Sequence, residues 1–102
     1  MTPFNAENRR RGRLRAAQFL YSLEFNGYNA EAALAAFWEM NPAKPAAREY
    51  AEMLLRGILR TRAELDSAID ESLENWVPSR VGRAERNILR IGVYELRHSG
   101  DV

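Results

Sequence analysis

The strongest concentration of chemically active side chains is a group of arginines near the start of the sequence. Five of them fall within seven positions, namely Arg9, Arg10, Arg11, Arg13 and Arg15. Guanidinium groups bind phosphates through paired hydrogen bonds and stack on unpaired bases, which favours RNA as the partner. The plainer alternative is a solvated or fraying N-terminus, and the composition of the cluster alone leaves that alternative open.

The distribution of charge supports a polyanionic partner for this end of the chain. The net charge of the whole sequence is +1, but residues 1–15 carry +4 and the remaining residues therefore carry −3. Residues 63–76 hold five carboxylates and no basic side chain, a pattern typical of a solvated helix face. Such an asymmetry indicates that one end of the chain meets a polyanion.

The arginines are predicted to form the first turns of a helix, because an apolar stripe begins at Leu14 without a break after the cluster. In a helix, Arg9 and Arg13 share one face, Arg11 and Arg15 share another, and Arg10 lies between. Positive charge near a helix N-terminus costs roughly 0.3–1 kcal/mol per group, and a bound polyanion would relieve this cost. Because Gly12 weakens the helix locally, we expect these turns to become ordered when RNA binds.

The residues offer little for catalysis, and we expect a protein that is not an enzyme and needs no metal or cofactor. There is no cysteine, and the single histidine, His98, lies beside Ser99 with no third group to orient the pair. At a helix C-terminus this histidine is better placed to interact with the helix dipole. The six glycines are scattered and form no phosphate-binding loop.

Length and composition are those of one small globular domain. The 102 residues are 46% hydrophobic and 28% charged, and the absence of cysteine excludes disulfides and thiolate metal sites. No apolar run approaches the ~18 residues of a membrane span, and no signal peptide is recognisable. We therefore expect a cytoplasmic protein.

The apolar spacing predicts an all-helical fold of about five helices and no strands. The expected helices cover residues 8–26, 30–40, a third stretch from Pro45 to about 60, residues 61–76 and residues 81–98. Asn29 is the expected N-cap of the second helix, and Gly57 is expected to mark a close helix–helix crossing or a kink. The last helix is apolar on more than one side, so its surface over 88–96 lacks a covering element.

Three stretches resemble the NusB family of bacterial transcription antitermination factors. The most specific is NWVPSRVGRAERNILRIGVYEL at residues 75–96. The positions that match the family signature in order are Trp76, Arg80, Glu85, Arg86, Ile88, Leu89, Arg90, Gly92, Tyr94, Glu95 and Leu96. RRRGRLRAAQFLYSLEF at 9–25 resembles the opening helix of the family. YAEMLLRGILRTRAELD at 50–66 resembles its middle helix.

The resemblance implies an all-helical protein that binds the single-stranded boxA element of ribosomal RNA leader transcripts. Ribosomal protein S10 would be the protein partner, and the complex would join the RNA polymerase antitermination complex. The family's RNA contacts fall on Arg9, Arg10, Arg11 and Arg13, with Arg15 as a further candidate. The S10 contact falls near Glu85 and Arg86. Tyr21 and Tyr94 could approach either of these sites, but we expect both to be core aromatics.

The chain departs from the family pattern because members continue with further helices after the Tyr-Glu-Leu segment. We expect residues 1–102 to form a single domain, with 1–7 disordered, 8–62 holding three helices and 63–102 starting the C-terminal half. The uncovered last helix predicts self-association. Two alternatives stay open, namely the NusB-like N-terminal domain of a ribosomal RNA cytosine methyltransferase and a protein-binding helical module without RNA binding.

Overall fold

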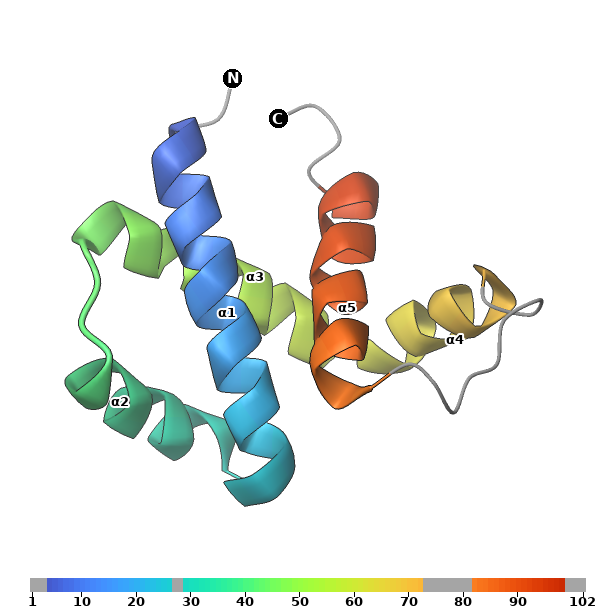
Figure 1. The fold of residues 1–102 in the computed structure, drawn as a ribbon, viewed down its shortest axis with the longest axis horizontal. Coiled ribbons are helices and arrows are strands. Elements are labelled where there is room, and N and C mark those ends of the chain that lie inside the picture. The colour runs from blue at the N-terminus through green and yellow to red at the C-terminus, as the bar shows by residue number, and fades with distance from the viewer. Residues whose placement is uncertain (1–3, 27–28, 73–81, 99–102) are drawn as a thin grey trace.

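The computed structural model describes residues 4–26, 29–72 and 82–98. The helices in these residues follow the helical periodicity of the sequence. In these residues the chain forms five helices and no strand (Figure 1). They are α1 (Ala6–Asn26), α2 (Ala30–Met40), α3 (Pro45–Arg60), α4 (Arg62–Ser72) and α5 (Arg83–His98). The predicted all-helical fold class is confirmed.

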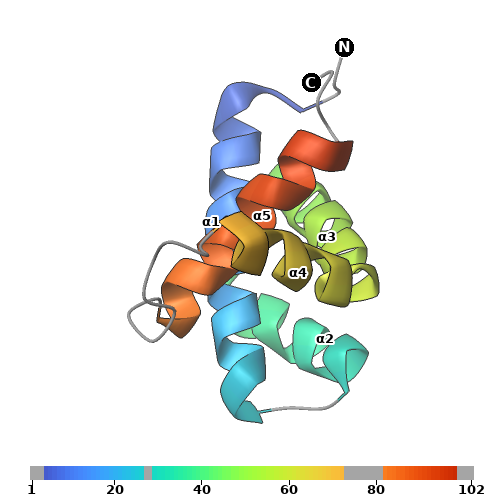
Figure 2. The same cartoon turned by 90° about the vertical axis from the view of Figure 1, so that its right-hand side faces the viewer.

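The helices are arranged around the pair α1 and α5, which lie side by side in opposite directions (Figure 1). Helix α3 crosses both members of the pair and contacts each of them. Helix α2 packs against α1, and Figure 2 shows α4 lying against α5 on another side of the molecule. The N-terminal half of α1 is therefore bordered by α3 and by the C-terminal half of α5.

Local sequence signals explain where the helices begin. The side chain of Asn29 accepts a hydrogen bond from the backbone N–H of Ala32 at 3.1 Å, so Asn29 caps α2 as predicted. Pro45 occupies the first turn of α3, where its missing N–H leaves no intrahelical bond unmade. Pro45 thus fixes where the connection between α2 and α3 ends, and this connection contributes to the site described below.

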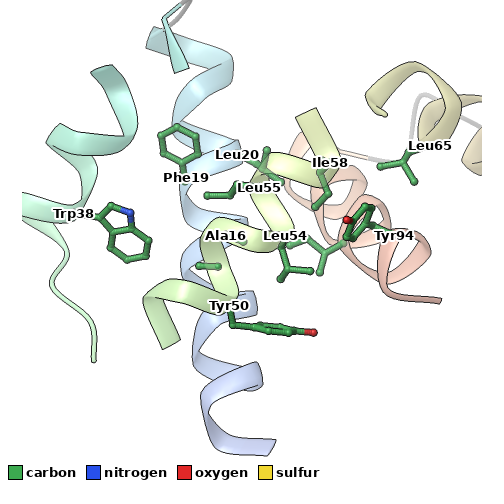
Figure 3. Close-up of a cluster of buried hydrophobic side chains, with 12 residues drawn as sticks. Ala16, Phe19, Leu20, Trp38, Tyr50, Leu54, Leu55, Ile58, Leu65 and Tyr94 are labelled. Atoms are coloured by element: carbon green, nitrogen blue, oxygen red, sulfur yellow. The ribbon is translucent and has the colours of Figure 1, made fainter. Parts of the chain in front are cut away.

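The core draws side chains from all five helices and centres on α3 (Figure 3). It includes Ala16, Phe19, Leu20, Trp38, Tyr50, Leu54, Leu55, Ile58, Leu65 and Tyr94. Gly57 of α3 faces the ring of Tyr94, and a Cβ at this position would overlap with the phenol. Gly57 therefore marks a close crossing of α3 and α5, one of the two interpretations that the sequence permitted.

The start of the chain is more ordered than predicted. Residues 4–7 were expected to be disordered together with residues 1–3, yet α1 begins at Ala6. The ring of Phe4 packs edge-on against Tyr50, with the centroids 5.1 Å apart. This contact anchors the residues before α1, and sequence periodicity does not reveal it because it pairs positions 46 residues apart. Residues 1–3 lie outside the described part of the chain.

Some predictions for the second half of the chain fall on residues that are not described. Helix α4 is described to Ser72, so the predicted end of this helix at Trp76 lies outside the described residues, as does Arg80 of the family signature. Tyr94 is buried as predicted, but the side chain of Tyr21 is 44% exposed, so its assignment to the core is wrong. Tyr21 lies on the flank of the α1 stripe, which the helices in the described part of the chain leave partly exposed.

Candidate nucleic-acid interface

The arginine cluster lies in an ordered helix that begins before it. The side chain of Asn5 accepts a hydrogen bond from the backbone N–H of Asn8 at 2.7 Å and so caps α1. Glu7 in the first turn places a negative charge where the helix dipole favours it. Asn5 and Glu7 offset part of the unfavourable interaction between the arginines and the helix dipole. The first turns of α1 are therefore formed without RNA, and the expectation that they become ordered on binding is wrong.

Arg10 and Arg11 are the most accessible arginines of the cluster. Their side chains are 73% and 50% exposed. Each is paired with Glu7, at 4.0 Å for Arg10 and 2.9 Å for Arg11. Exposed ion pairs of this kind contribute little to stability, because both groups stay well solvated. Both guanidinium groups are therefore free to exchange Glu7 for a phosphate.

The other three arginines of the cluster have partners within the fold. Arg9 donates to the carbonyl oxygen of Phe4 at 2.6 Å. Arg15 donates to the side chain of Gln18 at 2.9 Å and to the carbonyl oxygen of Pro42 at 3.3 Å. The Nε of Arg13 lies 2.8 Å from both carboxylate oxygens of Glu95 on α5. These contacts hold the three side chains against the protein, so their direct contact with RNA stays a prediction.

Arg13, Tyr50 and Glu95 form a polar cluster that joins α1, α3 and α5. The hydroxyl of Tyr50 donates to the carboxylate that also accepts from Arg13. Burial raises the pKa of Tyr50 to about 12, and the neighbouring Glu95 carboxylate adds to this shift. Tyr50 therefore remains a neutral donor at physiological pH. The cluster fixes the arginine-bearing end of α1 relative to α5.

A hollow of about 400 Å³ lies between α1 and α5 beside this cluster. Arg10 and Arg13 line it together with apolar groups of both helices, including Leu14 and Ile88. Leu14 is 58% exposed and Ile88 is 60% exposed. The open apolar surface predicted for the last helix is therefore present, and it also includes Leu89 and Leu96.

The two predicted partner-binding residues lie at the opposite end of the α1–α5 pair from the arginine cluster. Glu85 is exposed in the first turn of α5. Arg86 is mostly buried and donates to Asp70 of α4 at 2.9 Å. The neighbouring Arg90 is 5% exposed and pairs with Asp66 of α4 at 2.7 Å. Arg86 thus helps to attach α4 to α5, whereas Glu85 is available to a partner.

Sequence reasoning missed two residues that the fold adds to this surface. Lys44 lies before α3 and approaches Arg11 and Arg15 across a small hollow. Glu95 was recognised as part of the signature but was given no role, and it proves to be the partner of Arg13. Neither could be found from local spacing, because each depends on contacts between positions far apart in the chain.

The described residues contain no group of three or more histidine, cysteine or acidic side chains placed to hold a metal ion. None of the helices in the described ranges is both long and apolar enough to cross a membrane.

Comparisons with known proteins give consistent matches. The model of the NusB family matches residues 10–102. Transcription antitermination protein NusB of Sorangium cellulosum is 36% identical over 91 residues, covering 89% of this chain and 65% of that protein. The protein of the same name from Myxococcus xanthus is 38% identical over 98 residues, covering 92% and 70%. That from Listeria monocytogenes is 31% identical over 94 residues, covering 92% and 70%.

The chain spans about two thirds of the length of these curated relatives. No solved structure gives a significant match.

Proposed function

Because the chain belongs to the NusB family, we propose that it acts in transcription antitermination by binding single-stranded boxA RNA of ribosomal RNA leaders together with ribosomal protein S10. The observation that carries this proposal is the pair of exposed guanidinium groups of Arg10 and Arg11 on an ordered first helix. Arginine side chains on a fixed helix can bind backbone phosphates with little loss of order on binding.

The names of the relatives favour an antitermination factor over the methyltransferase domain. The three proteins compared above carry the name transcription antitermination protein NusB. Under this proposal Glu85 is the better candidate for contact with S10, because Arg86 is already paired with Asp70. Participation in the RNA polymerase antitermination complex and self-association through the open face of α5 remain parts of the proposal.

Titration with a short boxA-type RNA at two salt concentrations tests the proposal. We expect binding that weakens steeply with salt, because each neutralised phosphate of a single strand makes the slope of log affinity against log salt more negative by about 0.7. An RNA of the same composition in scrambled order is the control for sequence preference. Absence of binding at low salt, even with S10 present, would instead support the protein-binding module.

Substitution of Glu7 by glutamine is expected to increase RNA affinity about threefold and to steepen its salt dependence. The carboxylate of Glu7 competes with phosphate for Arg11, whose hydrogen bond is the main cause of the lowered pKa of Glu7. The measurement is the same RNA titration, made with Glu7→Gln. Glu64→Gln, at an exposed position of α4, removes the same charge away from the arginine cluster and serves as the control. Unchanged affinity in Glu7→Gln would show that Arg11 does not meet the RNA backbone.

A further inference from the structure

The connection between α2 and α3 brings a lysine next to the arginine-bearing face of α1. Lys44 is the only lysine of the sequence, and its side chain is exposed. It precedes α3 as the N-cap residue and makes no side-chain capping hydrogen bond. Capping of α3 therefore does not explain why a positively charged side chain occupies position 44.

A small hollow of about 130 Å³ lies between Lys44 and α1. Two cations of α1, Arg11 and Arg15, line it together with Lys44. Its remaining lining is uncharged and consists of Leu14, Pro42, Ala43 and Ala47. Pockets that enclose a whole organic ligand usually measure about 300–1,000 Å³, so this hollow suits a single small anionic group better than a nucleobase.

The chain itself shows that an anion is favoured beside this hollow. The pKa of Glu7 is lowered, first by the hydrogen bond and charge of Arg11 and further by the charges of Lys44 and Arg10. The field of Lys44 therefore adds to that of the α1 arginines around the same carboxylate. Arg15 is oriented toward the loop by the carbonyl oxygen of Pro42, at 3.3 Å. The positive charges of α1 and of the connection between α2 and α3 therefore lie close together around this hollow.

We propose that Lys44, together with Arg11 and Arg15, forms a binding subsite for one backbone phosphate of the RNA. The RNA would then pass from the exposed face of α1 onto the connection between α2 and α3. An ammonium group suits this place because it binds phosphate as a point charge from several directions. This inference rests on the proposed function, and it extends the RNA-binding surface beyond the arginine-rich helix.

The first test is the affinity of Lys44→Gln for the boxA-type RNA. We expect the affinity to fall about threefold to tenfold at low salt. The slope of log affinity against log salt should become less negative by about 0.7, because one phosphate contact is lost. Arg60→Gln is the matched control, because Arg60 is exposed at the far end of α3, about 24 Å along the helix axis from Lys44. Lys44→Arg should retain most of the affinity, since it keeps the charge.

The second test uses the fact that an amine-specific reagent can modify only Lys44 and the N-terminal amine. Saturating boxA-type RNA should slow modification of Lys44 several-fold, with mass spectrometry of the digested protein as the readout. Unchanged reactivity of Lys44 in the RNA complex, or equal affinities of Lys44→Gln and Arg60→Gln, would overturn the subsite. If the unaltered protein binds no RNA at all, the proposed function itself fails.

Discussion

Replacement of Arg10 and Arg11 by alanine is expected to lower the affinity for boxA-type RNA about 30-fold at low salt. These two side chains are the most exposed of the cluster, and their present partner, Glu7, holds them only weakly. The slope of log affinity against log salt should become less negative by about 0.7 for each phosphate that the variant no longer neutralises. Fluorescence anisotropy of a labelled RNA across a salt series measures both quantities.

The control for this variant removes the same charge elsewhere on the protein. Arg56 and Arg60 are exposed on the C-terminal half of α3, away from the arginine-bearing end of α1. Arg56/Arg60→Ala should therefore keep most of the RNA affinity, whereas a purely non-specific attraction would weaken equally in both double variants. Equal losses would refute a defined RNA surface on α1. Circular dichroism of each variant establishes that helicity is unchanged.

Arg9→Ala is informative in a different way, because its guanidinium group donates to the carbonyl oxygen of Phe4. Phe4 in turn packs on Tyr50, so the side chain of Arg9 helps to anchor the residues that precede α1. The five arginines thus divide into a pair that faces solvent and three that also stabilise the fold. Their close spacing in the sequence does not reveal this division.

Local sequence signals were sufficient to predict where helices form. They were insufficient to predict which charged side chains pair between helices. Asn29 and Pro45 could be assigned as helix starts because capping depends on residues within one turn. The partner of Arg13 is Glu95, 82 positions away, and only the antiparallel packing of α1 and α5 brings the two together. Lys44 comes to line a hollow with Arg11 and Arg15 of α1 for the same kind of reason.

The exposure of Leu14 shows that hydrophobic periodicity does not predict how deeply a side chain is buried. Helical spacing placed Leu14 on the apolar stripe of the first helix, yet its side chain is 58% exposed beside both hollows of the α1 surface. Spacing indicates which side chains share a face, but the other helices decide how much of that face they cover. In α5, likewise, Ile91 is buried while Ile88 stays exposed.

The crossing of α3 and α5 leads to a prediction in which two Gly→Ala substitutions have opposite signs. Alanine in place of glycine normally stabilises a helix interior by about 1 kcal/mol. At Gly57 the added methyl group would overlap with the ring of Tyr94, which is buried and stacked on His98. Overpacking of this kind costs about 1–3 kcal/mol. We therefore expect Gly57→Ala to lower the free energy of unfolding by about 2 kcal/mol.

Gly92 of α5 provides the matched control, because a Cβ there meets nothing within 4 Å. Gly92→Ala should raise the free energy of unfolding by about 1 kcal/mol, the value expected from helix propensity alone. Urea unfolding followed by circular dichroism measures both variants. The total stability of a domain this small is about 5–15 kcal/mol, so a difference of about 3 kcal/mol between the variants is readily resolved.

A double-mutant cycle with Tyr94→Leu assigns the loss at Gly57 to the phenol. Removing the ring makes room for the new methyl group, so Gly57→Ala should cost much less in the Tyr94→Leu background than in the original protein. Strain elsewhere in α3 would leave the cost of Gly57→Ala the same in both backgrounds. Tyr94 adjoins Glu95, whose carboxylate pairs with Arg13, so the close crossing at Gly57 lies next to the contact between α5 and the arginine-bearing end of α1. The small residue in α3 therefore contributes to the geometry of the arginine-bearing surface on α1.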